Sequence, residues 1–149
     1  MTATSYVNGA SSAPLIGLTL GQYFDQACAA HADREALVSC HQGLRLSYAE
    51  LRQQVDALAC SLLRIGLKPG ERIGIWSPNT AEWTLSQYAT AKAGLVLVNI
   101  NPAYRLSELE YALNKVGCRA LITAASFKSS DYLGMLHSLA PELQQYPPG

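Results

Sequence analysis

One run of residues constrains the fold more than any other: Leu95-Val-Leu-Val-Asn-Ile100 is apolar on both of its faces. Such a run is typical of the centre of a parallel sheet, because helices cover that kind of sheet on both sides. Amphipathic segments stand before it, from Ala81 to about Ala93, and after it, from Ser107 to Val116. The sequence therefore predicts a central parallel strand over 95–100 within an α/β fold.

The same alternation of helix and strand extends along most of the chain. Strands are predicted over 72–76 and 119–123, where short apolar runs stand between turn signals. A last amphipathic helix is predicted from about Ser130 to Leu139. From Tyr48 onward the order is helix, strand, helix, strand, helix, strand, helix. Right-handed βαβ connections turn this order into a parallel sheet with helices on its faces.

Helix starts are marked by capping residues. Thr19 is the expected N-cap of a short helix that begins at Leu20. Ser47 stands three residues before Glu50, which is the spacing of a capping box, and Ser107 and Glu110 repeat that spacing.

An N-terminal β-hairpin is expected before these helices. The strands would cover 36–40 and 44–48, with the glycine-containing turn His41-Gln-Gly43 between them.

Composition excludes several classes of protein. The chain has 149 residues, the usual size of one domain, and 11 basic and 11 acidic residues give a formal net charge of zero. A nucleic-acid-binding protein usually has a basic excess, so nucleic acid is not an expected partner. With 49% hydrophobic and 15% charged residues, the chain can build a core. No apolar run approaches the length of a membrane span.

The predicted organisation has three parts. Residues 1–17 read as a flexible leader, residues 18–140 as the folded domain, and residues 141–149 as a truncated tail. No Lys or Arg precedes Arg34, so the basic residues of a signal or transit peptide are missing. The expected location is therefore the cytoplasm.

No familiar catalytic or metal-binding motif is found in the sequence. The chain contains no GxGxxG or P-loop glycine pattern, no GxSxG elbow and no HExxH pair. Its cysteines are too far apart for a local metal site and are expected to be reduced: Cys28, Cys40, Cys60 and Cys118. We therefore expect neither catalytic residues nor a metal site in this chain.

Two loops that follow strands are candidates for ligand binding, because α/β folds bind ligands at the carboxyl ends of strands. They are Ser77–Thr80 and Asn99–Arg105. Arg105 has the geometry to bind an anionic ligand, and Tyr104 to stack on a base or cover a pocket. The alternative is structural: the first loop is a turn that caps a helix, and the second is a rigid turn with a solvated arginine.

Three stretches resemble the N-terminal part of acyl-CoA synthetases, members of the adenylate-forming superfamily. They are PGERIGIWSPNTAEW over 69–83, ATAKAGLVLVNINPAYR over 89–105 and ELEYALNKVGC over 108–118. The resemblance covers about residues 18–140 and is greatest to the medium-chain fatty-acid branch. It implies that the α/β fold is part of the large N-terminal domain of such an enzyme.

The resemblance also implies a reaction for the full-length family. A medium-chain carboxylate attacks Mg·ATP to form an acyl-adenylate, and coenzyme A then displaces AMP. The phosphate loop, the adenine motif and the C-terminal domain of the family lie beyond this chain, which resembles about the first quarter of the enzyme. The chain is therefore expected to be catalytically incomplete. A basic residue near the second loop approaches the phosphates of coenzyme A in some relatives, which assigns that role to Arg105, with Tyr104 beside it.

Two alternatives remain open. The chain could be a stand-alone remnant that binds a partner synthetase, or a small nucleotide-binding α/β module, although the latter predicts a phosphate loop that the sequence lacks. Under the synthetase reading, strand edges that the rest of the enzyme normally covers would be exposed. We then expect the isolated chain to be marginally stable or to self-associate.

Overall fold

The computed structural model describes Gly9, residues 12–13 and residues 15–146. The predicted leader over 1–17 falls largely outside these residues. Within them the chain forms, in order, α1 (Leu20–Ala30), β1 (Glu35–Ser39), a 3-10 turn η1 (Cys40–Gln42), β2 (Leu44–Ser47), α2 (Tyr48–Arg64), β3 (Arg72–Trp76), α3 (Ala81–Ala93), β4 (Val96–Ile100), α4 (Leu106–Val116), β5 (Cys118–Thr123), β6 (Ser126–Phe127), β7 (Ser130–Asp131), α5 (Tyr132–Leu139) and a second 3-10 turn η2 (Pro141–Gln145).

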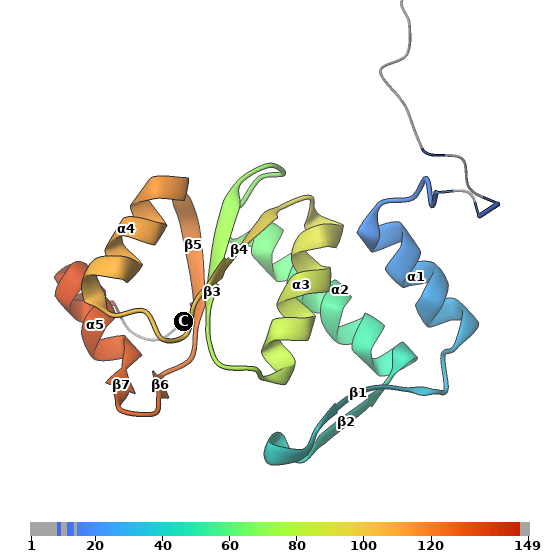
Figure 1. The fold of residues 1–149 in the computed structure, drawn as a ribbon, viewed down its shortest axis with the longest axis horizontal. Coiled ribbons are helices and arrows are strands. Elements are labelled where there is room, and N and C mark those ends of the chain that lie inside the picture. The colour runs from blue at the N-terminus through green and yellow to red at the C-terminus, as the bar shows by residue number, and fades with distance from the viewer. Residues whose placement is uncertain (1–8, 10–11, 14, 147–149) are drawn as a thin grey trace, which may run out of the picture.

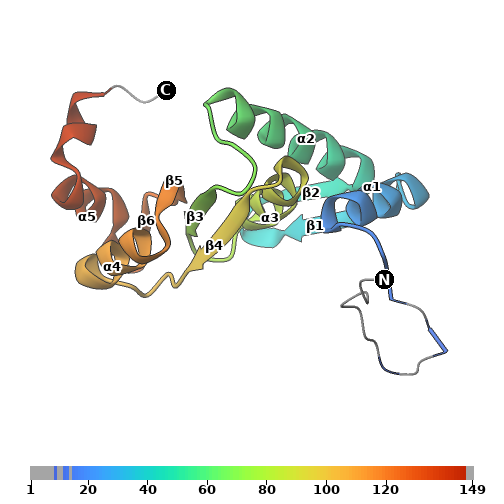
Figure 2. The same cartoon turned by 90° about the horizontal axis from the view of Figure 1, so that it is seen from above.

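The parallel sheet is confirmed, but its centre is not where the apolar run predicted it. The three strands lie in the order β4-β3-β5, and β3 pairs in parallel with both neighbours (Figure 2). The run over 95–100 thus forms an edge strand within the described residues, and Val96 is 48% exposed. An apolar run indicates that helices cover both faces of a strand. It does not indicate how many strands lie beside that strand, because this number depends on the whole sheet.

Gly74 allows β3 to take the central place. A Cβ atom at this position would lie 2.9 Å from a methyl carbon of Leu121 and 3.0 Å from one of Ile100. The side chains of both neighbouring strands therefore close over the glycine, and this face of the sheet packs tightly.

Helices cover both faces of the sheet, as predicted (Figure 1). On one face, α1, α2 and α3 form a core with the β1-β2 hairpin, centred on buried residues such as Val55, Ile73 and Ala89. On the other face, α4 and α5 enclose a smaller core of four buried residues: Trp76, Ile100, Leu109 and Tyr132. The molecule therefore has an α/β/α arrangement with two cores that share one sheet.

Two of the predicted helix caps are confirmed. The Thr19 hydroxyl accepts a hydrogen bond from the Gln22 N–H at 3.2 Å, and the Gln22 side chain accepts one from the Thr19 N–H at 3.0 Å. Ser47 and Glu50 form the same reciprocal pair at the start of α2. These boxes fix where α1 and α2 begin.

Two other helix starts differ from the prediction. Helix α4 begins at Leu106, because the Glu108 carboxylate accepts a hydrogen bond from the Arg105 N–H at 2.8 Å. Ser107 is therefore inside the helix. Ser130 belongs to β7, which pairs with β6, and the N-cap of α5 is Asp131.

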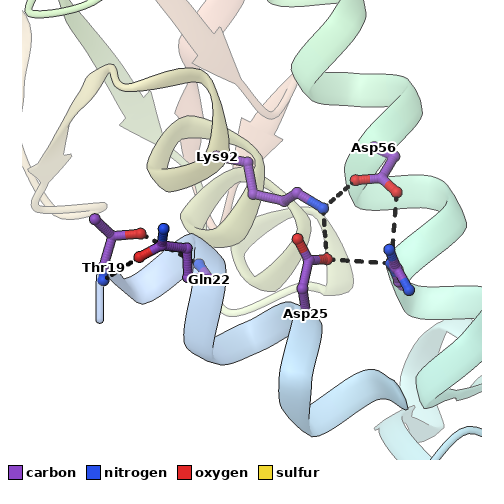
Figure 3. Close-up of polar contacts among 6 residues, drawn as sticks. Thr19, Gln22, Asp25, Asp56 and Lys92 are labelled. Atoms are coloured by element: carbon purple, nitrogen blue, oxygen red, sulfur yellow. Dashed lines mark hydrogen bonds and ion pairs between the residues drawn. The ribbon is translucent and has the colours of Figure 1, made fainter. Parts of the chain in front are cut away.

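A charge network joins the three helices of the larger core (Figure 3). The Lys92 ammonium on α3 donates hydrogen bonds to Asp25 on α1, at 2.7 Å, and to Asp56 on α2. The Arg52 guanidinium lies 3.1 Å from Asp25 and 3.8 Å from Asp56. Because Gly21 lets α1 approach the stem of Lys92, two carboxylates and two cations meet where the helices touch.

No helix among the described residues combines the length and the apolar character that crossing a bilayer requires.

Candidate functional site

The loops that follow the three parallel strands meet at one edge of the sheet. The Ala124 N–H donates to the Trp76 carbonyl at 3.2 Å, and the Thr123 hydroxyl donates to the same carbonyl at 3.1 Å. The Trp76 indole N–H donates to the Asn101 carbonyl at 3.1 Å. Both candidate loops therefore start from one hydrogen-bonded platform at the carboxyl end of the sheet, formed by Trp76, Asn101, Thr123 and Ala124.

Two buried, stacked aromatic side chains donate hydrogen bonds to the loop that follows β4. The rings of Trp76 and Tyr132 stack with their centroids 3.6 Å apart and an angle of 11° between their planes. The Tyr132 hydroxyl donates to the Pro102 carbonyl at 2.5 Å, while Trp76 holds the Asn101 carbonyl. Burial raises the pKa of the Tyr132 phenol above its usual value, so the hydroxyl stays protonated and available as a donor.

Asn101 shapes the loop itself. Its side-chain oxygen accepts a hydrogen bond from the Ala103 N–H at 2.9 Å, and its carbonyl accepts one from the Tyr104 N–H at 3.0 Å. The loop is thus a hydrogen-bonded turn rather than an open segment.

Arg105 and Tyr104 leave this turn in different directions. The Arg105 side chain is exposed, and one of its guanidinium nitrogens donates to the Ser130 hydroxyl at 2.8 Å. Tyr104 is half-buried and packs against the smaller core. The structure therefore does not bring the two predicted ligand residues to a single point. Arg105 presents a cation to solvent, whereas Tyr104 packs against the smaller core and also lines a groove of about 440 Å³.

The loop after β3 is fastened by tryptophan and glutamine side chains. The Trp83 indole N–H donates to the Ser77 carbonyl at 2.9 Å. Thr80 is the N-cap residue of α3, but its side chain makes no cap hydrogen bond. Instead the Gln42 side-chain oxygen, from the η1 turn, accepts from the Ala81 N–H at 2.8 Å. Sequence reasoning missed Gln42, because it lies 39 residues from the helix that it caps.

Gln42 also organises a small pocket beside this loop. Its side-chain nitrogen donates to the Glu82 carboxylate at 2.9 Å, and the Ser39 hydroxyl donates to its oxygen at 2.6 Å. The bond from Gln42 is the main reason that the pKa of Glu82 lies below its usual range. The pocket has a volume of about 250 Å³ and is lined by both polar and apolar side chains: Gln42, Ile75, Ser77, Thr80, Glu82, Ile122, Thr123 and Ala124.

We expect Gln42→Ala to lower the free energy of unfolding by about 1–2 kcal/mol, because it removes the cap acceptor for α3 and the donor to Glu82. Urea unfolding followed by circular dichroism measures the change. Gln53→Ala, at an exposed position of α2, is the matched control and should cost less than about 0.5 kcal/mol. Equal losses in the two variants would contradict the capping role.

Chemistry-bearing groups are sparse across the part of the chain that the structure describes. No group of three or more His, Cys, Asp or Glu side chains there could hold a metal ion. Cys28 is a buried free thiol whose pKa burial raises above its usual value, so it is a poor nucleophile. The platform can thus hold the two loops and present Arg105 at the carboxyl end of the sheet.

Comparison with known proteins gives this architecture a family. Residues 24–146 match the family model described as AMP-binding enzyme. The mitochondrial medium-chain acyl-CoA ligase ACSF2 of Mus musculus is 45% identical over 145 residues, which are 97% of this chain and 24% of that protein. The putative acyl-CoA synthetase YngI of Bacillus subtilis is 38% identical over 92% of this chain and 25% of its own length. The chain spans about a quarter of the length of these relatives.

Solved structures agree on the fold. The inhibitor-bound N-terminal domain of FACL13 from Mycobacterium tuberculosis matches with a TM-score of 0.75 and 23% identity, over 81% of this chain and 29% of that one. The N-terminal subdomain of NpsA from Klebsiella oxytoca, in complex with 3-hydroxyanthranilyl-AMSN, matches with a TM-score of 0.65 and 27% identity over 70% of this chain and 26% of that one. Since the family model matches well over half of the residues, the chain belongs to the AMP-binding enzyme family.

Proposed function

We propose that this chain forms the N-terminal portion of a medium-chain acyl-CoA synthetase. The complete enzyme would ligate a medium-chain carboxylic acid to coenzyme A at the expense of ATP, through an acyl-adenylate. One observation carries this proposal: the 45% identity with a medium-chain acyl-CoA ligase extends over 97% of the chain.

The proposed role of the chain is to provide a framework. It contributes a three-stranded piece of sheet, the helices on both faces and the platform that carries two loops. Adenylate formation would depend on residues outside this chain, because the described residues provide neither a phosphate loop nor a cluster of acids for Mg²⁺.

Arg105 is the residue that we propose for binding an anionic ligand. Its guanidinium is exposed at the carboxyl end of the sheet, and a guanidinium binds phosphate through paired hydrogen bonds. The bond to Ser130 restrains the side chain, so less rotational freedom is lost on binding. Arg105 would hold a phosphate group of coenzyme A, while Tyr104 would support the loop from the core side.

The compartment stays a prediction. The vertebrate relatives are named as mitochondrial proteins, so their names lend no support to the cytoplasmic location expected from the sequence.

The first experiment tests the chain alone. Isothermal titration with Mg·ATP, an acyl-adenylate analogue and coenzyme A is expected to show no binding tighter than millimolar to the first two, and no AMP release from medium-chain acids. Micromolar binding of Mg·ATP, or turnover, would favour the alternative of an independent nucleotide-binding module.

The second experiment tests Arg105 in a complete enzyme. A chimera carries this chain in place of the matching 145-residue segment of the mouse ligase. We expect Arg105→Ala to raise KM for coenzyme A roughly fivefold to tenfold, with adenylate formation unchanged. Arg64→Ala, at the exposed end of α2, is the matched control and should leave both quantities unchanged. An unchanged KM in Arg105→Ala would remove Arg105 from the site.

A further inference from the structure

Strand β4 leaves one of its edges without a partner strand among the described residues. The Val96 N–H donates to the Glu71 carbonyl, on the side of β3. Because backbone groups alternate between the two sides of a strand, Leu97 and Asn99 direct their N–H and C=O groups away from β3. These two residues offer a short template for another strand.

A groove runs beside this edge, between β4 and α4. Its volume is about 440 Å³, and its lining includes Val98, Ile100, Tyr104, Glu108, Tyr111 and Lys115. Tyr111 is 66% exposed although its ring is largely apolar. An open strand edge, an apolar groove and an exposed aromatic ring therefore lie on one continuous surface, which is typical of a protein interface.

The charges along the groove are self-complementary. Glu108 and Lys115 are seven residues apart on α4, so they lie about two helical turns apart on the same side, with Tyr111 near the midpoint. A two-fold axis through that midpoint places Glu108 of one copy opposite Lys115 of the other, and the reverse. The described structure gives Lys115 no carboxylate partner within its own chain.

We propose that a second copy of this chain occupies the groove. The two β4 strands pair antiparallel through Leu97 and Asn99, which joins two three-stranded sheets into one of six strands. An axis perpendicular to the sheet keeps both α4 helices on the same face, where they run antiparallel with their Tyr111 rings in contact. The interface is isologous, so it closes as a dimer of the isolated 149-residue chain.

The edge is tested with a proline variant and its matched control. Asn99→Pro removes an N–H that points away from β3, so the β3-β4 pairing is kept while strand addition is blocked. Asn99→Ala removes the same side chain and keeps the N–H. Sedimentation velocity from low to several hundred micromolar is expected to show a reversible dimer for the native chain and for Asn99→Ala, and a monomer for Asn99→Pro. A thermal melt of each variant confirms that it is folded.

The charge pairing is tested by mixing two variants. Lys115→Glu and Glu108→Lys are each expected to weaken the homodimer roughly tenfold, because each brings like charges together. In an equimolar mixture the heterodimer restores both opposite-charge pairs, so its dissociation constant should return to that of the native chain. Both variants are melted first, because Glu108 also accepts the Arg105 N–H.

Three results would each overturn the proposal. The first is a native chain that stays monomeric at several hundred micromolar, which would leave the edge to a strand from another protein. The second is an Asn99→Pro variant that associates as strongly as Asn99→Ala. The third is a charge-variant mixture that dimerises no better than its components.

Discussion

Trp76→Ala is expected to lower the free energy of unfolding by about 3–5 kcal/mol, the largest effect of a single substitution that we predict. Trp76 is fully buried at the centre of the smaller core, stacked on Tyr132. Its indole N–H also donates to the Asn101 carbonyl, so the substitution leaves a cavity and removes one of the two hydrogen bonds that this carbonyl accepts. Urea unfolding of the chain at low micromolar concentration measures the loss.

Two further variants keep this prediction testable if Trp76→Ala does not fold. Tyr132→Phe keeps the ring stack and removes only the hydroxyl that donates to Pro102, which should cost about 1–2 kcal/mol. Trp83→Ala is the comparison variant: it also removes an indole hydrogen bond, to the Ser77 carbonyl, but from a half-buried site, so it should cost less than Trp76→Ala. A folded Trp76→Ala variant within about 1 kcal/mol of the native chain would contradict the role of this core.

Lys92→Met is expected to lower the free energy of unfolding by about 1–3 kcal/mol, because it leaves Asp25 and Asp56 with Arg52 as the one cation that pairs with them among the described residues. Methionine keeps much of the apolar stem, and the Lys92 side chain is 17% exposed, so the loss reports mainly the ammonium group. Urea unfolding at neutral pH measures it.

The same network predicts a pH dependence. Burial disfavours the charged form of Lys92, but hydrogen bonds and charge attraction from Asp25 and Asp56 outweigh burial, and its pKa is raised above 10.5. A raised pKa means that the folded state holds this proton more tightly than the unfolded chain. The stabilisation is therefore complete below about pH 10.5 and is lost as the pH rises through the raised value.

Comparison across pH isolates this contribution. The difference in stability between the native chain and Lys92→Met should shrink as the pH is raised above 10.5. Lys68→Met, at an exposed position in the turn before β3, should show a stability close to that of the native chain at every pH. A difference for Lys92→Met that stays constant to pH 11.5 would contradict the network.

Local signals in the sequence were enough to predict much of this fold. Thr19 and Ser47 each meet their hydrogen-bond partners within three residues, so the spacing alone identified the first two caps. At the start of α4, two pairs of residues share that spacing, so the spacing alone could not identify the N-cap residue. Ser107 with Glu110 and Arg105 with Glu108 share that spacing, and in the structure the Glu108 carboxylate accepts a hydrogen bond from the Arg105 N–H.

Features that depend on distant residues could not be predicted in this way. The apolarity of the run over 95–100 indicates covered faces, but its place at an edge depends on the packing around Gly74 in β3. The cap of α3 comes from Gln42, on another element. Strands β6 and β7 have two residues each, too few for any periodic pattern.

The candidate site was located only in part. The segments 77–80 and 99–105 do follow parallel strands, but Asn99 and Ile100 belong to β4 itself, so the second loop begins at Asn101. The stacked rings of Trp76 and Tyr132 beneath the second loop come from residues more than 50 apart in sequence, so no local motif predicts their contact. The contacts of Tyr104 with the smaller core and of Arg105 with Ser130 join residues that are distant in sequence, so no local pattern predicts them.

The central claim is that this chain is the N-terminal framework of a medium-chain acyl-CoA synthetase. The most direct measurement is acyl-CoA formation by the chimera with the mouse ligase, supplied with Mg·ATP, coenzyme A and carboxylic acids of short, medium and long chain. We predict synthesis of medium-chain acyl-CoA by the chimera and none by the 149-residue chain alone. A chimera that folds but releases no AMP with any acid, or a chain that makes acyl-CoA by itself, would contradict the claim.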